Sequence, residues 1–235
     1  MQISKRLETV ARQMESGGVV ADIGCDHGFT SIFLIQEGLA SRAIAMDIRK
    51  GPLGAAREHV RQYGLEDKIE LRLSDGAQKL QPGEVDTLLI SGMGGALICG
   101  ILEASPEVVK KTKELILSPQ SEIYLVRKLV HRLGFRIERE TMLVDQGKYY
   151  VIIRAVPGQE IYDREEEYLY GRYLLRQKDG VLLGFLEREL QRVERILGSM
   201  EQSELSEGGC RQRQELLKKQ RMIQWCRKEI GGEVW

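Results

Sequence analysis

Short apolar runs and amphipathic stretches alternate along the first two thirds of the chain. Val19 to Ile23 is nearly all apolar, which is typical of a strand covered on both faces of a parallel sheet. Apolar residues at helical spacing from Ile3 to Glu15 predict an amphipathic helix before that strand. Further strands are predicted at 43–48, 69–73, 85–90 and 114–117, and helices at 29–37, 51–63, 96–103 and 122–133.

Two more strands, at residues 135–144 and 149–156, flank Asp145-Gln-Gly-Lys148 and predict an antiparallel hairpin. Repeated strand–helix units followed by such a hairpin indicate an α/β fold with a Rossmann-like seven-stranded sheet. After Pro157-Gly158 the apolar spacing is helical only, with a break at Asp179-Gly180 and a polar stretch at 203–209. We therefore expect two domains, 1–158 with the sheet and 159–235 with a helical hairpin or coiled coil.

Charge and cysteine content exclude several classes of protein. Among the 235 residues, 35 Lys and Arg balance 35 Asp and Glu, so net charge by itself does not point to nucleic acid. The four cysteines form no C-x-x-C pair, so we expect neither a metal site nor a disulfide framework. Neither a run of about 18 apolar residues nor the apolar core of a signal peptide is present, which favours a cytoplasmic protein without membrane contact.

The first strand ends in two glycines, Gly24 and Gly28, at the edge of the sheet where doubly wound folds bind ligands. A dinucleotide fingerprint would need glycines at the positions of Asp26 and Phe29, so a nicotinamide oxidoreductase is disfavoured. Asp26 would also repel a pyrophosphate. S-adenosylmethionine carries a sulfonium and an ammonium, and the acids Asp22 and Asp26 suit it better. The pattern D-x-G-x-x-x-G resembles the first motif of Rossmann-like methyltransferases.

Later strand ends agree with this cofactor. Asp47 follows the second strand about 20 residues after the glycine turn, where a carboxylate can hold both ribose hydroxyls. Asp75 follows the third strand, where methyltransferases hold the adenine amine, although an Asp-Gly turn is an equally ordinary explanation. The loop Ser91-Gly-Met-Gly-Gly95 leaves room for a flat base. It lacks the Asn or Asp with two prolines used on exocyclic amines, which favours another acceptor atom.

The motifs together resemble one family, the bacterial tRNA (adenine-22, N1)-methyltransferases. The resemblance covers residues 1–156 motif by motif, and the helical hairpin resembles that family's coiled-coil domain. It is carried by Ala21-Asp-Ile-Gly-Cys-Asp-His-Gly28, Asp47-Ile48 with Gly51-Pro52, Ser74-Asp-Gly76, Gly92-Met-Gly-Gly95, Leu117-Ser-Pro-Gln120 and Lys148-Tyr-Tyr150.

The resemblance implies methyl transfer from S-adenosyl-L-methionine to the N1 nitrogen of an adenine in the D-arm region of tRNA. Met93 and Gly94 would lie beside the target base. Asp26 would either ease the charge of the cationic product or contact the cofactor's ammonium, and both roles stay open. The cofactor-binding residues would be Asp22, Gly24, Asp26, His27, Gly28, Asp47, Ile48, Ser74, Asp75, Gly76 and Gly92.

RNA would need contacts outside the cofactor site. The candidates are Lys5, Arg6, Arg12, Tyr149, Tyr150, Arg211, Arg213, Lys218 and Lys219, although basic runs are often simply solvated faces and the tyrosines suit a strand. We expect a monomer with the hairpin helping to clamp tRNA, and the alternative of a dimerising hairpin stays open. Two other functions also stay open: a small-molecule methyltransferase and an RNA-binding module without catalysis.

Overall fold

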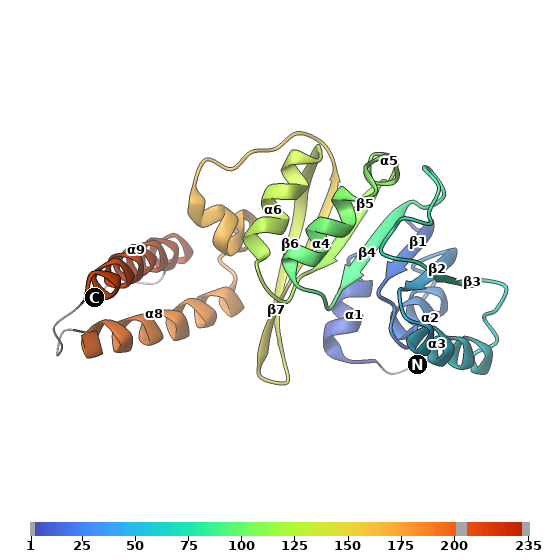
Figure 1. Ribbon diagram of the computed structural model, residues 1–235, viewed down its shortest axis with the longest axis horizontal. Helices are drawn as coiled ribbons and strands as arrows, with labels where there is room; N and C mark the ends of the chain where they lie inside the picture. The colour runs from blue at the N-terminus through green and yellow to red at the C-terminus, as the bar shows by residue number, and fades with distance from the viewer. Residues whose placement is uncertain (1–2, 201–205, 232–235) are drawn as a thin grey trace. The chain divides into compact units, whose positions relative to one another are not determined.

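The computed structural model describes residues 3–200 and 206–231, and the chain folds into two compact units, 1–161 and 162–235. The sequence placed its domain boundary after residue 158. In the first unit, most strands are followed by a helix, and the last two strands form an antiparallel hairpin (Figure 1).

A seven-stranded sheet forms the centre of the first unit, as predicted, and its strands lie in the order β3-β2-β1-β4-β5-β7-β6. The strands are β1 (Val19–Ile23), β2 (Arg42–Asp47), β3 (Ile69–Leu73), β4 (Thr87–Ser91), β5 (Glu114–Ser118), β6 (Phe135–Asp145) and β7 (Lys148–Pro157). The first five are parallel, and β7 pairs antiparallel with both β5 and β6. Strand order reverses between β1 and β4, and this is the switch point where open α/β sheets bind ligands.

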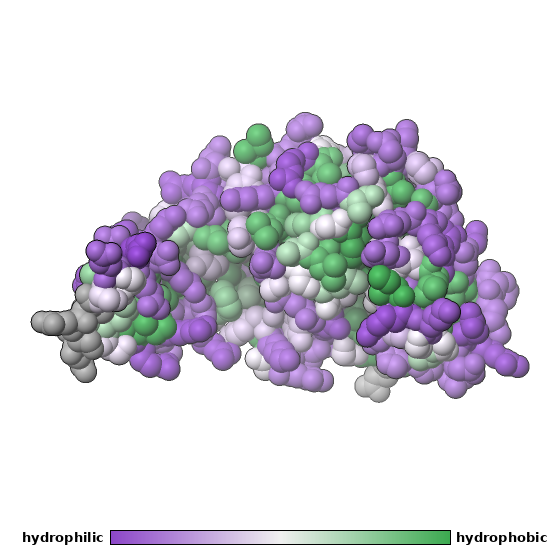
Figure 2. All heavy atoms as spheres, in the orientation of Figure 1, coloured by the Kyte–Doolittle hydropathy of each residue, from purple (hydrophilic) through white to green (hydrophobic). Residues whose placement is uncertain are grey.

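Helices cover both faces of the sheet. The connections from β1 to β3 and those from β4 to β5 proceed in opposite directions across the sheet, and right-handed crossovers therefore place their helices on opposite faces. In chain order they are α1 (Lys5–Ala11), α2 (Phe29–Gln36), α3 (Lys50–Gln62), α4 (Gly95–Glu103), α5 (Pro106–Val109) and α6 (Ile123–Arg132). The core between helices and sheet is apolar, with Ile32, Leu34 and Leu89 fully buried. Leu97 on α4 and Tyr124 on α6 are exposed, and Figure 2 shows hydrophobic side chains gathered over this part of the surface.

The second unit is helical. Residues Glu167–Gly171 form a π-helix that continues into α7 (Arg172–Arg176), and the long helices α8 (Gly180–Met200) and α9 (Glu207–Ile230) follow. Lys219 pairs with Glu189, whereas Gly231 lies beside Lys178, so α8 and α9 run antiparallel as the predicted hairpin. Asp179 starts α8 by accepting hydrogen bonds from the amides of Val181 and Leu182.

Three element predictions were wrong in extent. The helix predicted over 3–15 ends at Ala11, because the amides of Glu15 and Ser16 donate to the Glu114 carboxylate instead of continuing the helix. The helical spacing that begins at Ile161 does not form one regular helix: residues 161–164 are not helical, and a π-helix at Glu167–Gly171 precedes α7. Gly208 and Gly209 lie inside α9, since Ser206 caps that helix by accepting from the amide of Gly209; residues 203–205 of the predicted turn lie outside the described residues.

Candidate functional site

A cavity of about 360 Å³ opens at the carboxyl ends of β1, β2 and β4. Its walls come from the turn after β1, from Asp47 and Arg49 after β2, from the loop after β4, and from Arg6 and Leu7 on α1. The full lining is Arg6, Leu7, Asp22, Gly24, Cys25, Asp26, His27, Phe29, Thr30, Asp47, Arg49, Ser91, Gly92, Met93 and Gln120.

The turn after β1 needs its glycines. Gly24 has φ +75°, and a Cβ there would come within 2.2 Å of the Met93 Cε atom. Gly28 has φ +74°, caps α2, and lies so close to α3 that a Cβ would meet the Ala56 Cβ at 3.1 Å. Between them, Asp26 also has a left-handed backbone, with φ +50°, which is uncommon for a residue with a side chain. The turn thus keeps backbone close to the cavity and presents Asp26 at its rim.

Three carboxylates face the cavity from different depths. Asp22 is only 4% exposed and accepts a hydrogen bond of 2.7 Å from the Ser31 hydroxyl. Burial raises the pKa of Asp22 to about 6, against the opposing effect of that hydrogen bond. Asp47 is also buried, and its Oδ1 accepts from the Arg49 amide at 2.8 Å. Asp26 is exposed, with its carboxylate 3.7 Å from the His27 Nε2 atom.

Aromatic rings line the cavity mouth beside Asp26. His27 stacks on Phe29 with ring centroids 5.7 Å apart, and Phe29 stacks on His59 at 4.5 Å. The His59 Nδ1 atom is 3.0 Å from the His27 carbonyl oxygen, which ties α3 to the turn. Together these rings form a partly exposed aromatic cluster, of which His27 and Phe29 line the cavity.

The opposite wall is the loop after β4, held by backbone hydrogen bonds to the loop after β5. The Gly92 amide donates to the Ser118 carbonyl and the Gln120 amide to the Met93 carbonyl. A Cβ at Gly95 would lie 2.5 Å from the Ser121 carbonyl oxygen, so only glycine lets α4 begin this close. The loop is therefore a fixed surface, and Met93 lies across it above Gly24.

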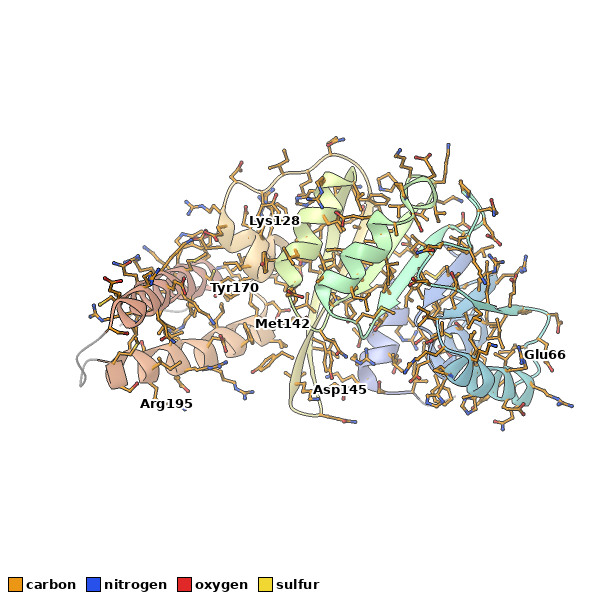
Figure 3. All side chains as sticks on the ribbon, in the orientation of Figure 1. Glu66, Lys128, Met142, Asp145, Tyr170 and Arg195 are labelled. Carbon is orange, nitrogen blue, oxygen red and sulfur yellow. The ribbon has the colours of Figure 1, made fainter. Side chains whose placement is uncertain are left out.

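Arg6 connects α1 to this wall. Its Nη1 donates to the Ser91 hydroxyl at 2.9 Å, and its guanidinium lies 5.4 Å from the centre of the Tyr150 ring. Its backbone amide donates to Asp145, which lies in the β6–β7 hairpin (Figure 3). Helix α1 thus places one arginine where the cavity wall meets the hairpin.

Seven of the residues named from the sequence for cofactor or target base line the cavity: Asp22, Gly24, Asp26, His27, Asp47, Gly92 and Met93. Gly28 and Gly94 instead cap α2 and α4. Ile48, Ser74, Asp75 and Gly76 are outside the lining, although the Ser74 amide donates to the Asp47 carbonyl and keeps that loop adjacent.

The basic candidates are dispersed. Arg6 lines the cavity, whereas Arg12 is held by Glu8 and Glu37, and Lys218 and Lys219 are held by Glu165 and Glu189. Lys5 and Arg211 are exposed, and Arg213 and Tyr149 are half-buried, as is Tyr150.

Sequence reasoning missed some of the lining. It named no role for Leu7, Thr30 or Arg49, and Cys25 entered only as part of a motif. Burial raises the pKa of the Cys25 thiol well above its usual range. Gln120 entered only as part of a motif. The amphipathic pattern of the first helix was the one signal for Leu7, but it could not show which end of the sheet the helix reaches.

Known proteins agree with this geometry. Residues 3–153 match the family described as "Methyltransferase domain". The tRNA (adenine(22)-N(1))-methyltransferase of Bacillus subtilis is 34% identical over 86% of this chain and 87% of its own length. The crystal structure of the B. subtilis m1A22 tRNA methyltransferase TrmK aligns with a TM-score of 0.87 at 32% identity, covering 96% of this chain and 98% of that one. A Streptococcus pneumoniae protein in complex with S-adenosyl-L-methionine aligns with a TM-score of 0.86 at 30% identity, covering 96% and 99%.

Fold, site and relatives coincide over nearly the whole length of the chain. The seven-stranded order, the glycine turn after β1 and the strand-end carboxylates are those expected of a methyltransferase, and the match extends into the helical unit. The chain belongs to the tRNA (adenine(22)-N(1))-methyltransferase family.

Proposed function

We infer that this protein transfers the methyl group of S-adenosyl-L-methionine to the N1 nitrogen of adenine 22 in tRNA. The observation that carries the inference is the cavity at the switch point, with three carboxylates on one side and a rigid glycine loop on the other. Relatives that are similar to this chain over most of its length are named for that reaction. A tRNA substrate supports a cytoplasmic location for the reaction. Among the described residues, no helix is long and apolar enough to cross a membrane.

The residues present fit the cofactor. Asp47 lies where a carboxylate binds the ribose hydroxyls, and Asp22 and Asp26 supply negative charge for the ammonium and sulfonium. Ile48, Ser74, Asp75, Gly76 and Gly92 would surround the adenine and the rest of the ligand. When bound, the cofactor supplies an electrophilic methyl group on a positively charged sulfur.

The acceptor nitrogen needs no base, because the adenine N1 atom already has a free lone pair. That lone pair forms the new bond to the methyl carbon as the carbon–sulfur bond breaks, and the positive charge passes from sulfur to the base. The enzyme's task is alignment, which is worth roughly 7–11 kcal/mol in well-positioned reactions. We assign it to the wall of Met93 and Gly94, with Arg6 and Tyr150 beside it.

Two roles remain for Asp26, and one variant separates them. If the carboxylate stabilises the charge on the methylated base, Asp26→Asn lowers kcat about tenfold at saturating cofactor. A tenfold loss is roughly the contribution of one charge-assisted contact. If it only holds the ammonium, the same change raises KM for the cofactor and leaves kcat as it was. Steady-state kinetics with both substrates varied gives the answer, and unchanged kcat would rule out the electrostatic role.

The function itself is tested with labelled cofactor and an unmodified tRNA transcript. We expect the label to appear as N1-methyladenosine and to be lost when adenine 22 is replaced by guanine. A transcript with another D-arm adenine replaced is the matched control and should accept the label normally. If no tRNA accepts label while the cofactor still binds, a small-molecule acceptor becomes the better assignment.

A further inference from the structure

The helical unit has a cavity of its own that the methyl transfer does not use. It measures about 380 Å³ and is bordered by the π-helix, by α7 and by the end of α9. Three arginines, Arg164, Arg172 and Arg176, stand around Trp225, with Glu167 and Glu229 as the acidic residues of the lining. A π-helix adds a residue to the turn and often occurs at functional sites, and here it carries Glu167.

The three arginines differ in how they are held. Arg172 is bound by Glu167 through two contacts of 2.8 and 2.9 Å, which neutralises both groups. The Arg164 guanidinium lies 4.6 Å from the centre of the Trp225 ring. Arg164 and Arg176 are exposed, and within residues 3–200 and 206–231 no carboxylate is within ion-pair distance of either. The cavity therefore offers two guanidinium groups that an anion can reach without breaking an ion pair.

The lysines predicted to grip RNA on α9 are in the opposite situation. The Lys218 Nζ atom is 2.7 Å from Glu165, and the Lys219 Nζ atom is 2.5 Å from Glu189. A phosphate contact at either lysine would have to compete with its carboxylate partner. Arg164 and Arg176 have no such carboxylate competitor among the described residues, and they line a cavity that also contains a half-buried indole.

We infer that this cavity binds one nucleotide of the tRNA substrate, and this inference rests on the proposed function. A guanidinium held over an indole is a flat surface on which an unstacked base stacks, and single-stranded RNA is recognised in this way. Arg176, exposed on α7, contacts the phosphate of the same nucleotide. The ligand is thus a nucleotide, combining a π-face with a negative charge, and its source is the tRNA and not the free nucleotide pool.

The test is tRNA binding by the full chain, measured by filter retention for Arg164→Ala and Arg176→Ala. Each change raises Kd about five- to tenfold, because stacking or a phosphate contact is lost. Arg176→Ala also lowers the slope of log K against log salt by about one, which a loss of shape alone would not do. Arg195→Ala on α8 (Figure 3) removes the same charge from an exposed position elsewhere in the unit and should stay within about twofold of the wild type.

A second readout does not depend on binding constants. The chain has two tryptophans, so Trp235→Phe leaves Trp225 as its only indole. We expect tRNA to quench the Trp225 fluorescence and adenosine monophosphate at the same concentration to leave it unchanged. Quenching by the mononucleotide, with tRNA affinity equal in all variants, would overturn the assignment in favour of a free-nucleotide site.

Methyl transfer by the wild type is recorded alongside, so that the two proposals fail separately. If the wild type methylates tRNA but Arg164→Ala and Arg176→Ala bind tRNA as tightly as it does, the nucleotide site is wrong and the proposed function stands. If no tRNA is methylated, the proposed function itself fails. Cofactor binding, measured by calorimetry, should be equal in all four proteins because both arginines belong to the helical unit.

Discussion

Burial decides how the Asp22 carboxylate titrates. Its side chain lies behind the glycine turn with one hydrogen-bond donor, Ser31, and its pKa is about 6 instead of 3.8. The folded protein therefore binds more protons than the unfolded chain between about pH 4 and pH 6. A raised carboxyl pKa lowers stability as the pH rises through this window, and the loss is complete above the folded pKa. A pKa shift of two units corresponds to a loss of at most about 3 kcal/mol in the free energy of unfolding.

We therefore expect Asp22→Asn to be more stable than the wild type at pH 7.5, by about 1–3 kcal/mol. Asparagine keeps an oxygen for the Ser31 hydroxyl but carries no charge to bury. The advantage should shrink toward pH 4.5, where the wild-type carboxyl is protonated. Urea unfolding without cofactor at several pH values measures the difference. Asp75→Asn, at an exposed position, removes the same charge and should show no such trend; an Asp22→Asn protein less stable at pH 7.5 contradicts the explanation.

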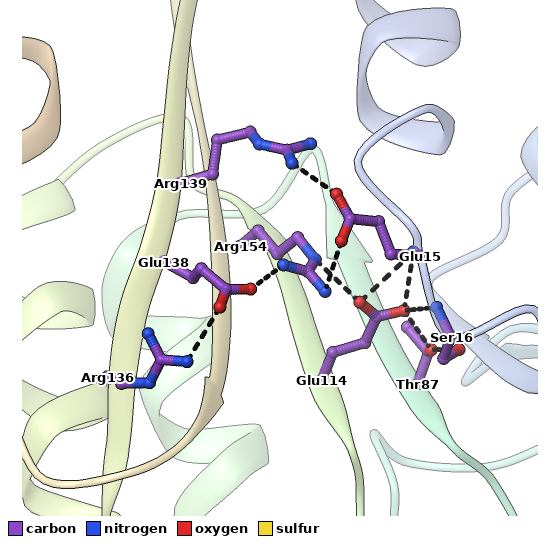
Figure 4. A network of polar contacts seen from close by, with 8 residues as sticks. All are labelled: Glu15, Ser16, Thr87, Glu114, Arg136, Glu138, Arg139 and Arg154. Carbon is purple, nitrogen blue, oxygen red and sulfur yellow. Dashed lines mark hydrogen bonds and ion pairs between the residues drawn. The ribbon is translucent and has the colours of Figure 1, made fainter. Parts of the chain in front are cut away.

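At the scale of elements, a buried ion network joins the segment after α1 to four strands (Figure 4). Arg154 on β7 contacts Glu114, Glu15 and Glu138. Glu114 is 1% exposed and also accepts from the Thr87 hydroxyl and from the amides of Glu15 and Ser16. Glu114 and Thr87 begin β5 and β4, so the network lies at the end of the sheet opposite the cavity. The network fixes the path of the segment between α1 and β1. It thereby helps to position α1, the helix that carries Arg6.

Removing Arg154 should be costly because the buried Glu114 side chain then loses its cationic partner. We expect Arg154→Ala to lower the free energy of unfolding by about 3–5 kcal/mol, as for other broken buried pairs. Arg139→Ala, which removes an exposed partner of Glu15, should cost less than about 1 kcal/mol. Urea unfolding compares the two. Recovery of most of the loss in Arg154→Met combined with Glu114→Gln would show that the unpaired charge is the cause, and equal losses in the two single variants would contradict it.

Local sequence signals were reliable for elements whose own residues determine them. The central strands β1 and β4 appeared as apolar runs because both faces of the parallel sheet are covered, and each of the seven predicted strands was placed within about two residues. The errors came where a distant group decides the outcome. Glu114, far along the chain, takes the amides that would have extended α1. Ser206 starts α9 early enough to include two glycines, because a side-chain cap outweighs their weak helix propensity.

At the scale of the whole molecule, each unit has its own core. Leu182, Leu186 and Val193 of α8 are buried in the helical unit together with Ile223 and Cys226 of α9, while the sheet and its helices enclose the other core. One unit therefore carries the cavity at the carboxyl ends of β1, β2 and β4, and the other carries the cavity around Trp225. The nucleotide site proposed for the helical unit is a prediction at this scale, since it gives that unit a part in holding the substrate.

The sequence by itself determined the fold class, the order of the strands and helices, the methyl-donor motif and the family. The fold class and the order of the elements follow from periodicity, and the motif follows from residues that act through their own backbone, such as Gly24 and Gly28. The family followed from the resemblance of the motifs. Only the tertiary structure decided which distant residues meet: Arg6 with Ser91, Met93 above Gly24, Arg154 with Glu114, and Arg164 with Trp225. The physical reason is that partner choice depends on packing between elements, and nothing in the local pattern of either partner encodes it.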